Sequence, residues 1–231
     1  MASPNRLDVR SCAALVPVRE LNGAKQRLAG ELCLGERVEL ALSMMRDMLS
    51  ALASVPALDR VVVVSSDREV HAEAERCGAE SLHENIPLGL NGAVSWAATQ
   101  LELSGIDTLL TIPGDVPLLD PAEVESLLIA ACTRPSVVAV PSASGTGTNA
   151  LVTSPPTVIE PAFEGHSLEA HREACRLRGI ELQVVTLPGF ALDVDTPTDL
   201  LALARSGSGK GSGRLATELL ERRVLAARVS D

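Results

Sequence analysis

Two short acidic segments lie far apart in this sequence of 231 residues, and each follows a stretch with the character of a buried strand. Asp115 lies in the first, Gly-Asp-Val-Pro-Leu, and Asp193 and Asp195 lie in the second, Asp-Val-Asp-Thr-Pro. In open α/β sheets, ligands bind in the crevice beyond the carboxyl ends of the strands. Carboxylates that converge there repel one another unless a hard cation joins them, and Mg²⁺ with substrate phosphates is the usual solution. The pattern therefore predicts a metal-dependent enzyme that handles a nucleotide.

The spacing of the two aspartates in the second segment supports a shared ligand. Asp193 and Asp195 are two residues apart, so in an extended segment both side chains project to the same face. A turn before Pro197 would account for Asp195 alone, and Asp115 has a similar alternative as a turn former. Asp120 precedes a proline at the start of a helical pattern, and we assign it to helix capping.

A polar loop after the first strand is a candidate phosphate site, because it contains Gly23, Lys25 and Arg27. Glycine lets the backbone approach a phosphate, and the two cations supply donors and positive charge. The loop matches neither the Walker A pattern nor the GxGxxG fingerprint. Taken alone, Lys25 and Arg27 are equally well explained as solvated loop charges.

Three further segments could contact an anion or a base. The run Gly145-Thr146-Gly147-Thr148-Asn149 offers backbone N–H groups of the kind that form an anion-binding nest. Ser167 begins a helix whose first amides would face a carboxylate or phosphate, or it simply caps that helix. We expect His171, one turn later, to partner Ser167 and not to act as a base. Asn91 either caps its own helix or reads a base edge.

Composition bounds the class of protein. The chain is 46% hydrophobic but only 1% aromatic, so its core must be aliphatic. A formal net charge of −10 argues against a nucleic-acid partner, whose usual footprint on a protein is a basic patch. No apolar run reaches the ~18 residues that a membrane span needs. With no signal-peptide pattern and five dispersed cysteines, the sequence predicts a cytoplasmic protein without disulfides.

Strand and helix patterns alternate along the chain. Strands are expected at residues 12–18, 60–65, 108–112, 136–140, 149–153 and 182–187, and helices at 36–54, 68–77, 90–103, from 121, at 167–178, from 197 and at 215–229. This order predicts an α/β fold with a three-layer, mostly parallel but mixed sheet. We expect one domain at 1–204, a Gly/Ser linker at 205–213 and a C-terminal helix at 214–231.

Six segments in this order resemble the 2-phospho-L-lactate guanylyltransferase family, which includes phosphoenolpyruvate and 3-phosphoglycerate guanylyltransferases of coenzyme F420 biosynthesis. They are Val-Pro-Val-Arg…Ala-Lys-Gln-Arg-Leu, Gly-Leu-Asn-Gly-Ala, Gly-Asp-Val-Pro-Leu-Leu, Gly-Thr-Gly-Thr-Asn-Ala-Leu, Phe-x-x-x-Ser-x-x-x-His and Asp-Val-Asp-Thr-Pro-x-Asp-Leu. The resemblance covers roughly residues 12 to 220. One departure is Glu164, which stands where the family usually has glycine, with Gly165 one place on.

The resemblance implies a Rossmann-like nucleotide-diphospho-sugar transferase fold and transfer of GMP from GTP to a phosphorylated three-carbon acid, with release of pyrophosphate. It implies nucleotide binding by Pro17, Val18, Gly23, Lys25 and Asn91, catalysis by Lys25, Arg27 and Asp115, Mg²⁺ binding by Asp115, Asp193 and Asp195, and acid binding by Thr148, Gly165 and Ser167. A general base is not required, because a phosphate monoester is already an anionic nucleophile.

Two other functions remain open on the sequence alone. A nucleotidyltransferase with another acceptor, such as a molybdopterin guanylyltransferase or a sugar-phosphate cytidylyltransferase, would share the acidic positions. A non-catalytic nucleotide-binding regulatory domain would have no need of them. The sequence is compatible with a homodimer, and it leaves the choice among phosphoenolpyruvate, 2-phospho-L-lactate and 3-phosphoglycerate open.

Overall fold

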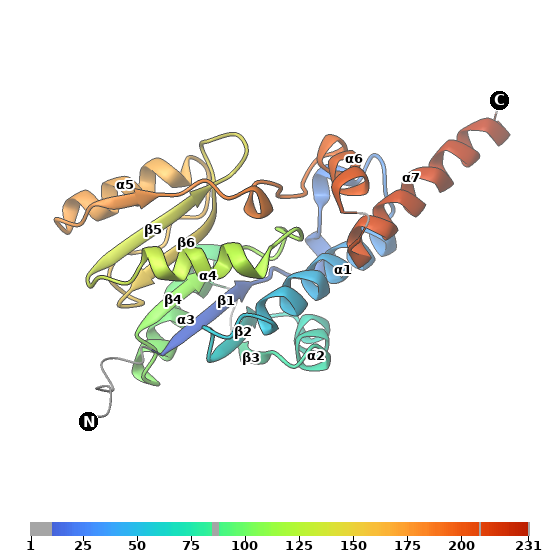
Figure 1. Cartoon of the computed structure of the whole chain (residues 1–231). Helices are drawn as coiled ribbons and strands as arrows, with labels where there is room; N and C mark the ends of the chain where they lie inside the picture. The colour runs from blue at the N-terminus through green and yellow to red at the C-terminus, as the bar shows by residue number, and fades with distance from the viewer. Residues whose placement is uncertain (1–10, 85–87, 208, 231) are drawn as a thin grey trace, which may run out of the picture.

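The computed structural model describes residues 11–84, 88–207 and 209–230 (Figure 1). A seven-stranded sheet in the order β3-β2-β1-β4-β6-β5-β7 forms its centre. Only β6 runs antiparallel to its neighbours β4 and β5, which confirms the expected mixed, mostly parallel sheet. The strands are β1 (Cys12–Pro17), β2 (Arg60–Ser65), β3 (Glu80–His83), β4 (Thr108–Thr111), β5 (Ser136–Pro141), β6 (Thr148–Ser154) and β7 (Leu182–Val184).

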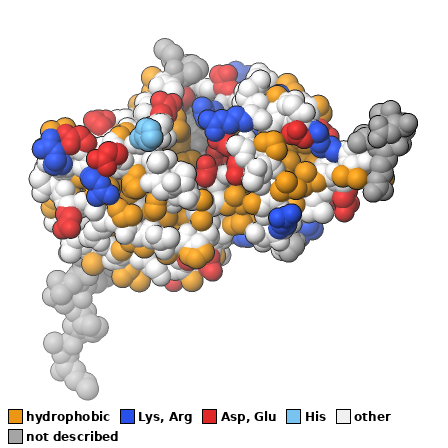
Figure 2. Space-filling view, turned by 90° about the horizontal axis from the view of Figure 1, so that it is seen from above, with side chains coloured by type: hydrophobic (Ala, Val, Ile, Leu, Met, Phe, Trp, Pro, Cys, Tyr) orange, Lys and Arg blue, Asp and Glu red, His pale blue; other side chains and the backbone are white. Residues whose placement is uncertain are grey.

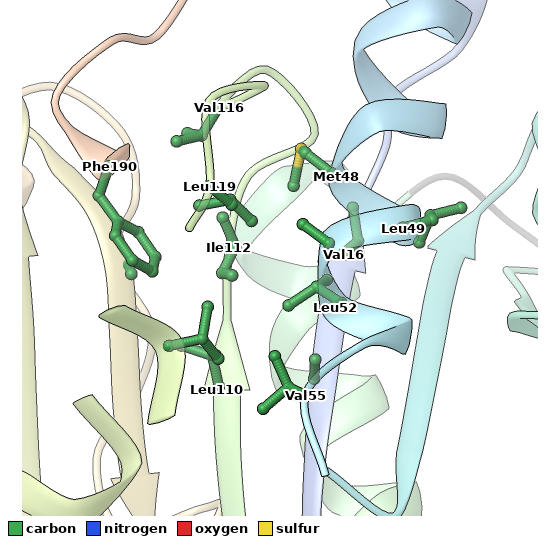
Figure 3. Packing of buried hydrophobic residues seen from close by; sticks show 14 of the residues in the cluster. Val16, Met48, Leu49, Leu52, Val55, Leu110, Ile112, Val116, Leu119 and Phe190 are labelled. Carbon is green, nitrogen blue, oxygen red and sulfur yellow. The ribbon is translucent and has the colours of Figure 1, made fainter. Parts of the chain in front are cut away.

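Helices cover both faces of this sheet. On one face lie α1 (Leu34–Ala53), α2 (Arg68–Arg76) and α4 (Pro121–Ala130), and on the other lie α3 (Gly89–Leu103) and α5 (Ser167–Leu177). Figure 3 shows the first of these cores, where Met48 and Leu52 of α1 pack towards Val16 of β1 and Leu110 of β4. Alternate residues of the strands thus pack on opposite faces, where one core lies under α1, α2 and α4 and separate cores lie under α3 and under α5, as expected for a buried sheet.

Two further helices pack on the outer side of α1. The helices α6 (Pro197–Ser206) and α7 (Gly211–Ser230) share a further core with α1, which contains Leu40, Met44, Leu203, Ala216 and Leu219. The N-terminus of α7 is capped from α1, because the Asp47 carboxylate accepts from the backbone N–H groups of Gly211 at 3.0 Å and Ser212 at 2.7 Å. Among the described residues, no helix is long and apolar enough to cross a membrane.

The connection between α6 and α7 is shorter than the Gly/Ser linker expected at 205–213. Helix α6 continues to Ser206 and α7 begins at Gly211. A Cβ on Gly213 would lie 1.9 Å from the carbonyl oxygen of Gly207, so the absent side chain lets the two helices approach closely. Here the small residues permit close packing, whereas composition alone suggested flexibility.

The sheet brings several loops to one edge. Strands β1, β2, β3 and β4 are parallel, so the segments that leave their carboxyl ends emerge on the same side of the molecule. The Lys25 loop follows β1, Glu84 follows β3, and Asp115 follows β4. A 3-10 helix, η3 (Pro188–Phe190), leads the chain back to this edge, where the Val194 N–H donates to the carbonyl oxygen of Asp115 at 3.1 Å.

Candidate active site

The two acidic segments meet at one lysine. Lys25 Nζ lies 3.0 Å from Asp115 Oδ2 and 3.0 Å from Asp195 Oδ1, and only 9% of its side chain is exposed. The guanidinium of Arg27 lies 3.6 Å from the other oxygen of Asp195. Figure 2 looks down on the top of the molecule in Figure 1 and shows basic and acidic side chains side by side around a hollow near the middle of this face. Asp115 and Asp195, which lie 90 and 170 positions from Lys25 in the sequence, thus share its ammonium group.

The loop that presents Lys25 is held in an unusual conformation. Lys25 has a φ of 47° and is the only described non-glycine residue with a positive φ. This left-handed conformation costs roughly 1–2 kcal/mol for a residue with a side chain. Arg37 of α1 donates to the carbonyl oxygen of Ala24 at 2.7 Å, and Asp67 accepts from the backbone N–H of Leu21 at 2.9 Å. Because neighbouring elements hold the loop, the strained conformation of Lys25 is retained.

A cavity of about 610 Å³ opens beside this lysine. Its size fits a ligand pocket, which typically encloses ~300–1,000 Å³. The walls bring together seven of the residues predicted from the sequence, namely Pro17, Val18, Gly23, Lys25, Arg27, Asp115 and Asp195. Gly114 is required where two strand ends meet, because a Cβ there would lie 2.9 Å from Val18 Cγ2.

The charges at the site are strongly coupled. Burial acts to lower the pKa of Lys25, but Asp115 and Asp195 outweigh it and raise the pKa above its ordinary value. Burial acts to raise the pKa of Asp195, and Lys25 followed by Arg27 more than reverses this, so the pKa lies below its usual range. Lys25 is therefore protonated and Asp195 ionised at neutral pH.

Asp193 is held differently from the other two acids. Asn149 Nδ2 donates to Asp193 Oδ1 at 3.3 Å, and it also donates to the carbonyl oxygen of Phe190 at 2.9 Å. Burial raises the pKa of Asp193, and the charges of Asp115 and Asp195 raise it further against the opposing hydrogen bond from Asn149. The charge effects indicate that a cation near all three acids would relieve their repulsion.

The donor set at the site fits a hard cation, but not a complete protein cage. Across residues 11–84, 88–207 and 209–230, no group of three or more His, Cys, Asp or Glu side chains is arranged to hold a metal ion on its own. Asp115 and Asp195 nevertheless converge on one positive atom, the ammonium nitrogen of Lys25. Magnesium is usually bound by one or two carboxylates together with substrate phosphates, so these residues match its preferences.

None of the three residues predicted to bind the acid lines the 610 Å³ cavity. Gly165 and Ser167 lie at the start of α5, and Thr148, the first residue of β6, contacts this helix at His171. Ser167 is 1% exposed, and its Oγ has no hydrogen-bond partner among the described residues. Gly165 has a φ of 63°, whereas Glu164 is exposed. The residue with left-handed backbone conformation in this turn is therefore Gly165, and the side chain of Glu164 lies in solvent.

His171 partners Thr148, and the expectation that it would partner Ser167 is wrong. Thr148 Oγ1 lies 3.1 Å from His171 Nδ1, and the backbone N–H of Ala162 donates to His171 Nε2 at 2.9 Å. The ring reaches across to β6 and away from the first turn of its own helix. Burial lowers the pKa of His171 to about 4, so the ring is neutral at pH 7. Since Nε2 accepts, Nδ1 carries the proton and donates to Thr148, whose hydroxyl proton remains available for another acceptor.

Asn91 does not cap its own helix, because the N-cap of α3 is Leu88. Its Oδ1 accepts from the backbone N–H of Phe163 at 2.7 Å, and this bond ties α3 to the loop before α5. Asn91 is also not among the cavity walls. Sequence reasoning missed Asn149 as the partner of Asp193, Asp67 as the anchor of the lysine loop, and Glu84 in the cavity wall. Of these, only Asn149 had a signal, because it ends the Gly145–Asn149 run.

Known structures share this fold. A structure described as a nucleotide-diphospho-sugar transferase from Desulfovibrio desulfuricans aligns with a TM-score of 0.72 at 18% identity, covering 92% of this chain and 98% of that chain. A cytidylyltransferase from Leptospira borgpetersenii aligns with a TM-score of 0.60 at 15% identity, covering 96% of each chain. The chain therefore has the nucleotide-diphospho-sugar transferase fold.

Sequence relatives narrow the class to nucleotidyltransferases. The chain is 38% identical over 194 residues to a phosphoenolpyruvate guanylyltransferase of Conexibacter woesei, covering 84% of this chain and 87% of the relative. It is 39% identical over 197 residues to the protein of the same name from Rubrobacter xylanophilus, covering 85% and 95%. A 3-phospho-D-glycerate guanylyltransferase of Phenylobacterium zucineum is 34% identical over 213 residues, covering 90% and 97%. The protein is a nucleotidyltransferase. The profile of the guanylyl transferase CofC-like family matches residues 12–223, and the chain belongs to this family.

Proposed function

We propose that this enzyme transfers GMP from GTP to a phosphorylated three-carbon acid and releases pyrophosphate, as a step of coenzyme F420 biosynthesis. The observation that carries the proposal is the lysine-centred cluster, in which Lys25 joins Asp115 to Asp195 at the mouth of a nucleotide-sized cavity. The names of the relatives support guanylyl transfer to phosphoenolpyruvate or 3-phosphoglycerate. The family match favours this reaction over the alternative acceptors and over a non-catalytic domain.

The positions of the charges suggest how this chain would assist the reaction. The triphosphate of GTP would lie along the Gly23–Arg27 loop, where Lys25 and Arg27 face the cavity. A phosphate oxygen of the acid attacks the α-phosphorus in line, and pyrophosphate leaves. Because the attacking group is already anionic, no side chain has to remove a proton. Catalysis then depends on positioning and on cations that offset the charge developing in the transition state.

We propose Mg²⁺ as the cofactor, held by Asp115 and Asp195 with Asp193 beside them. When bound, the metal supplies charge neutralisation and orients the phosphate oxygens. The convergence of Asp115 and Asp195 on one cationic atom supports this assignment. Lys25 would then leave its bridging position and donate to phosphate oxygens, which also carry negative charge. Removal of divalent ions with EDTA is expected to stop transfer, and added Mg²⁺ is expected to restore it.

The acid substrate is proposed to bind at Thr148, Gly165 and Ser167. A buried hydroxyl without a partner is costly, so the Ser167 Oγ is suited to a ligand oxygen. The Thr148 hydroxyl can donate because His171 donates to it. The N-terminus of α5 adds backbone amides that favour a carboxylate.

The decisive experiment replaces the active-site aspartates one at a time and measures pyrophosphate release. Asp115→Asn and Asp193→Asn are each expected to abolish release with GTP, Mg²⁺ and any of the three acids, while circular dichroism shows folded protein. Asp120→Asn is the matched control, because Asp120 caps α4 through Ala122 N at 2.9 Å and does not line the cavity. Near-normal release by either active-site variant would contradict the proposal.

A further inference from the structure

The cavity continues beyond the lysine loop to the end of β3. Val64 and Ser66 at the end of β2 line it, and Glu84, directly after β3, lines it next. Neighbouring strands lie ~4.8 Å apart, and β2 separates β1 from β3 in the sheet. Glu84 therefore lies about 10 Å across the strand ends from the loop that follows β1. A nucleotide whose phosphates contact Lys25 would extend its nucleoside towards Glu84.

Glu84 carries an acceptor without a donor. Its Oε1 is buried, and it has no hydrogen-bond partner among the described residues. The residue itself is held in place, because its backbone N–H donates to the carbonyl oxygen of Ser65 at 2.9 Å. Burial raises the pKa of Glu84, and a backbone hydrogen bond from Leu88 opposes this only in part. Within the described part of the chain, no lysine or arginine pairs with this carboxyl group.

A buried carboxylate oxygen that lacks a donor is costly unless a ligand supplies one. A carboxylate only accepts hydrogen bonds. The base edge of guanine offers two adjacent donors, N1–H and the N2 amino group, whereas adenine places an unprotonated nitrogen at N1. A carboxylate at this position would therefore bind guanine through these donors and disfavour adenine.

We propose that Glu84 selects the nucleotide by accepting hydrogen bonds from the N1–H and N2 amino group of guanine. The inference rests on the proposed function, in which GTP is the nucleotide, and it adds the residue that reads the base. Leu88 binds one carboxyl oxygen from the start of α3, and the other oxygen is left without a donor among the described residues, in a side chain that lines the cavity. A competing arrangement, in which Glu84 binds the ribose hydroxyls, would give no selection among bases.

Nucleotide analogues separate base reading from ribose reading. Inosine triphosphate (ITP) lacks only the N2 amino group, and dGTP lacks only the 2′-hydroxyl. A hydrogen bond to a charged group contributes about 1.5–3 kcal/mol, which corresponds to roughly 10- to 100-fold in kcat/KM. We expect the wild-type enzyme to prefer GTP over ITP by about this factor. Equal use of GTP and ITP by the wild type would overturn the proposal without any variant.

The isosteric variant Glu84→Gln tests the residue itself. Its amide oxygen can still accept from Leu88, which turns the NH₂ group towards the donors of guanine. We expect kcat/KM for GTP to fall about 10-fold or more, and the GTP-to-ITP ratio to fall towards one while the GTP-to-dGTP ratio is unchanged. Glu80→Gln is the control, because Glu80 is at the other end of β3 and pairs with Arg60. If Glu84→Gln instead loses the preference for GTP over dGTP and keeps the preference for GTP over ITP, Glu84 binds the ribose and base reading is refuted.

Equilibrium binding distinguishes this inference from the proposed function. Affinities for GTP and ITP can be compared by calorimetry without any acid or turnover. If the wild type binds GTP more tightly than ITP and Glu84→Gln removes the difference, the inference holds even where no acid supports pyrophosphate release. If transfer proceeds but the variant binds both nucleotides as the wild type does, the inference fails and the proposed function stands.

Discussion

Replacing His171 with asparagine is expected to flatten the pH dependence of folding stability. His171 is completely buried, and burial lowers its pKa from 6.5 to about 4. In the unfolded chain the ring takes up a proton near pH 6.5, but in the folded protein it becomes protonated only near pH 4. The stability that this histidine contributes is therefore fully present above pH 6.5 and is lost as pH falls towards 4. At 1.36 kcal/mol per pKa unit, the loss amounts to about 3 kcal/mol.

Asparagine is the informative substitution because its amide nitrogen can replace Nδ1 as the donor to Thr148, yet it does not titrate. The variant also loses the bond that Ala162 N–H makes to His171 Nε2, which lowers stability by about 1–3 kcal/mol. This second cost does not depend on pH. The slope of stability against pH thus isolates the titration from the lost contact.

Urea denaturation from pH 7 down to pH 4 measures this slope. The wild type is expected to lose about 3 kcal/mol more than His171→Asn over this interval. His166→Asn serves as the control for exchanging a histidine for asparagine, because His166 is an exposed histidine in the turn before α5. Other groups with shifted pKa values, such as His71, are present in all three proteins and cancel in the difference. Parallel curves for the wild type and His171→Asn would refute the reasoning.

Two further substitutions test how the helices and the active site are built. Gly213→Ala should destabilise the protein by about 3 kcal/mol in chemical denaturation, since its Cβ would meet the Gly207 carbonyl. Gly209→Ala, where the space is open, should have little effect. Equal effects of the two substitutions would contradict the packing argument. Lys25→Met should lower kcat for pyrophosphate release by about 100- to 1,000-fold in a folded protein, because in the proposed mechanism Lys25 donates to the phosphate oxygens of GTP. A variant with unchanged kcat would exclude Lys25 from the chemistry.

Much of the architecture could be predicted from local patterns. The four consecutive valines of β2 indicate a strand buried on both faces, and the apolar stripe of α1 indicates its sheet-facing side. Strand β3 escaped prediction because it is a four-residue strand at the sheet edge with mixed burial, so neither apolar run nor clear alternation identifies it. The close approach of Gly207 to Gly213 could not be predicted, because composition cannot distinguish a glycine in open space from one under a neighbouring backbone.

What the sequence determined by itself was the set of residues able to do the chemistry and their positions at strand ends, since residue type and hydrophobic period are local properties. Only the tertiary structure decided which of these residues meet. Lys25 reaches Asp115 and Asp195 across 90 and 170 positions because parallel strands deliver their loops to one edge. The partner of His171, and the lack of a donor to Glu84 Oε1 within the described part of the chain, were likewise decided by packing, because a hydrogen bond depends on distance and direction, which spacing along a chain does not set.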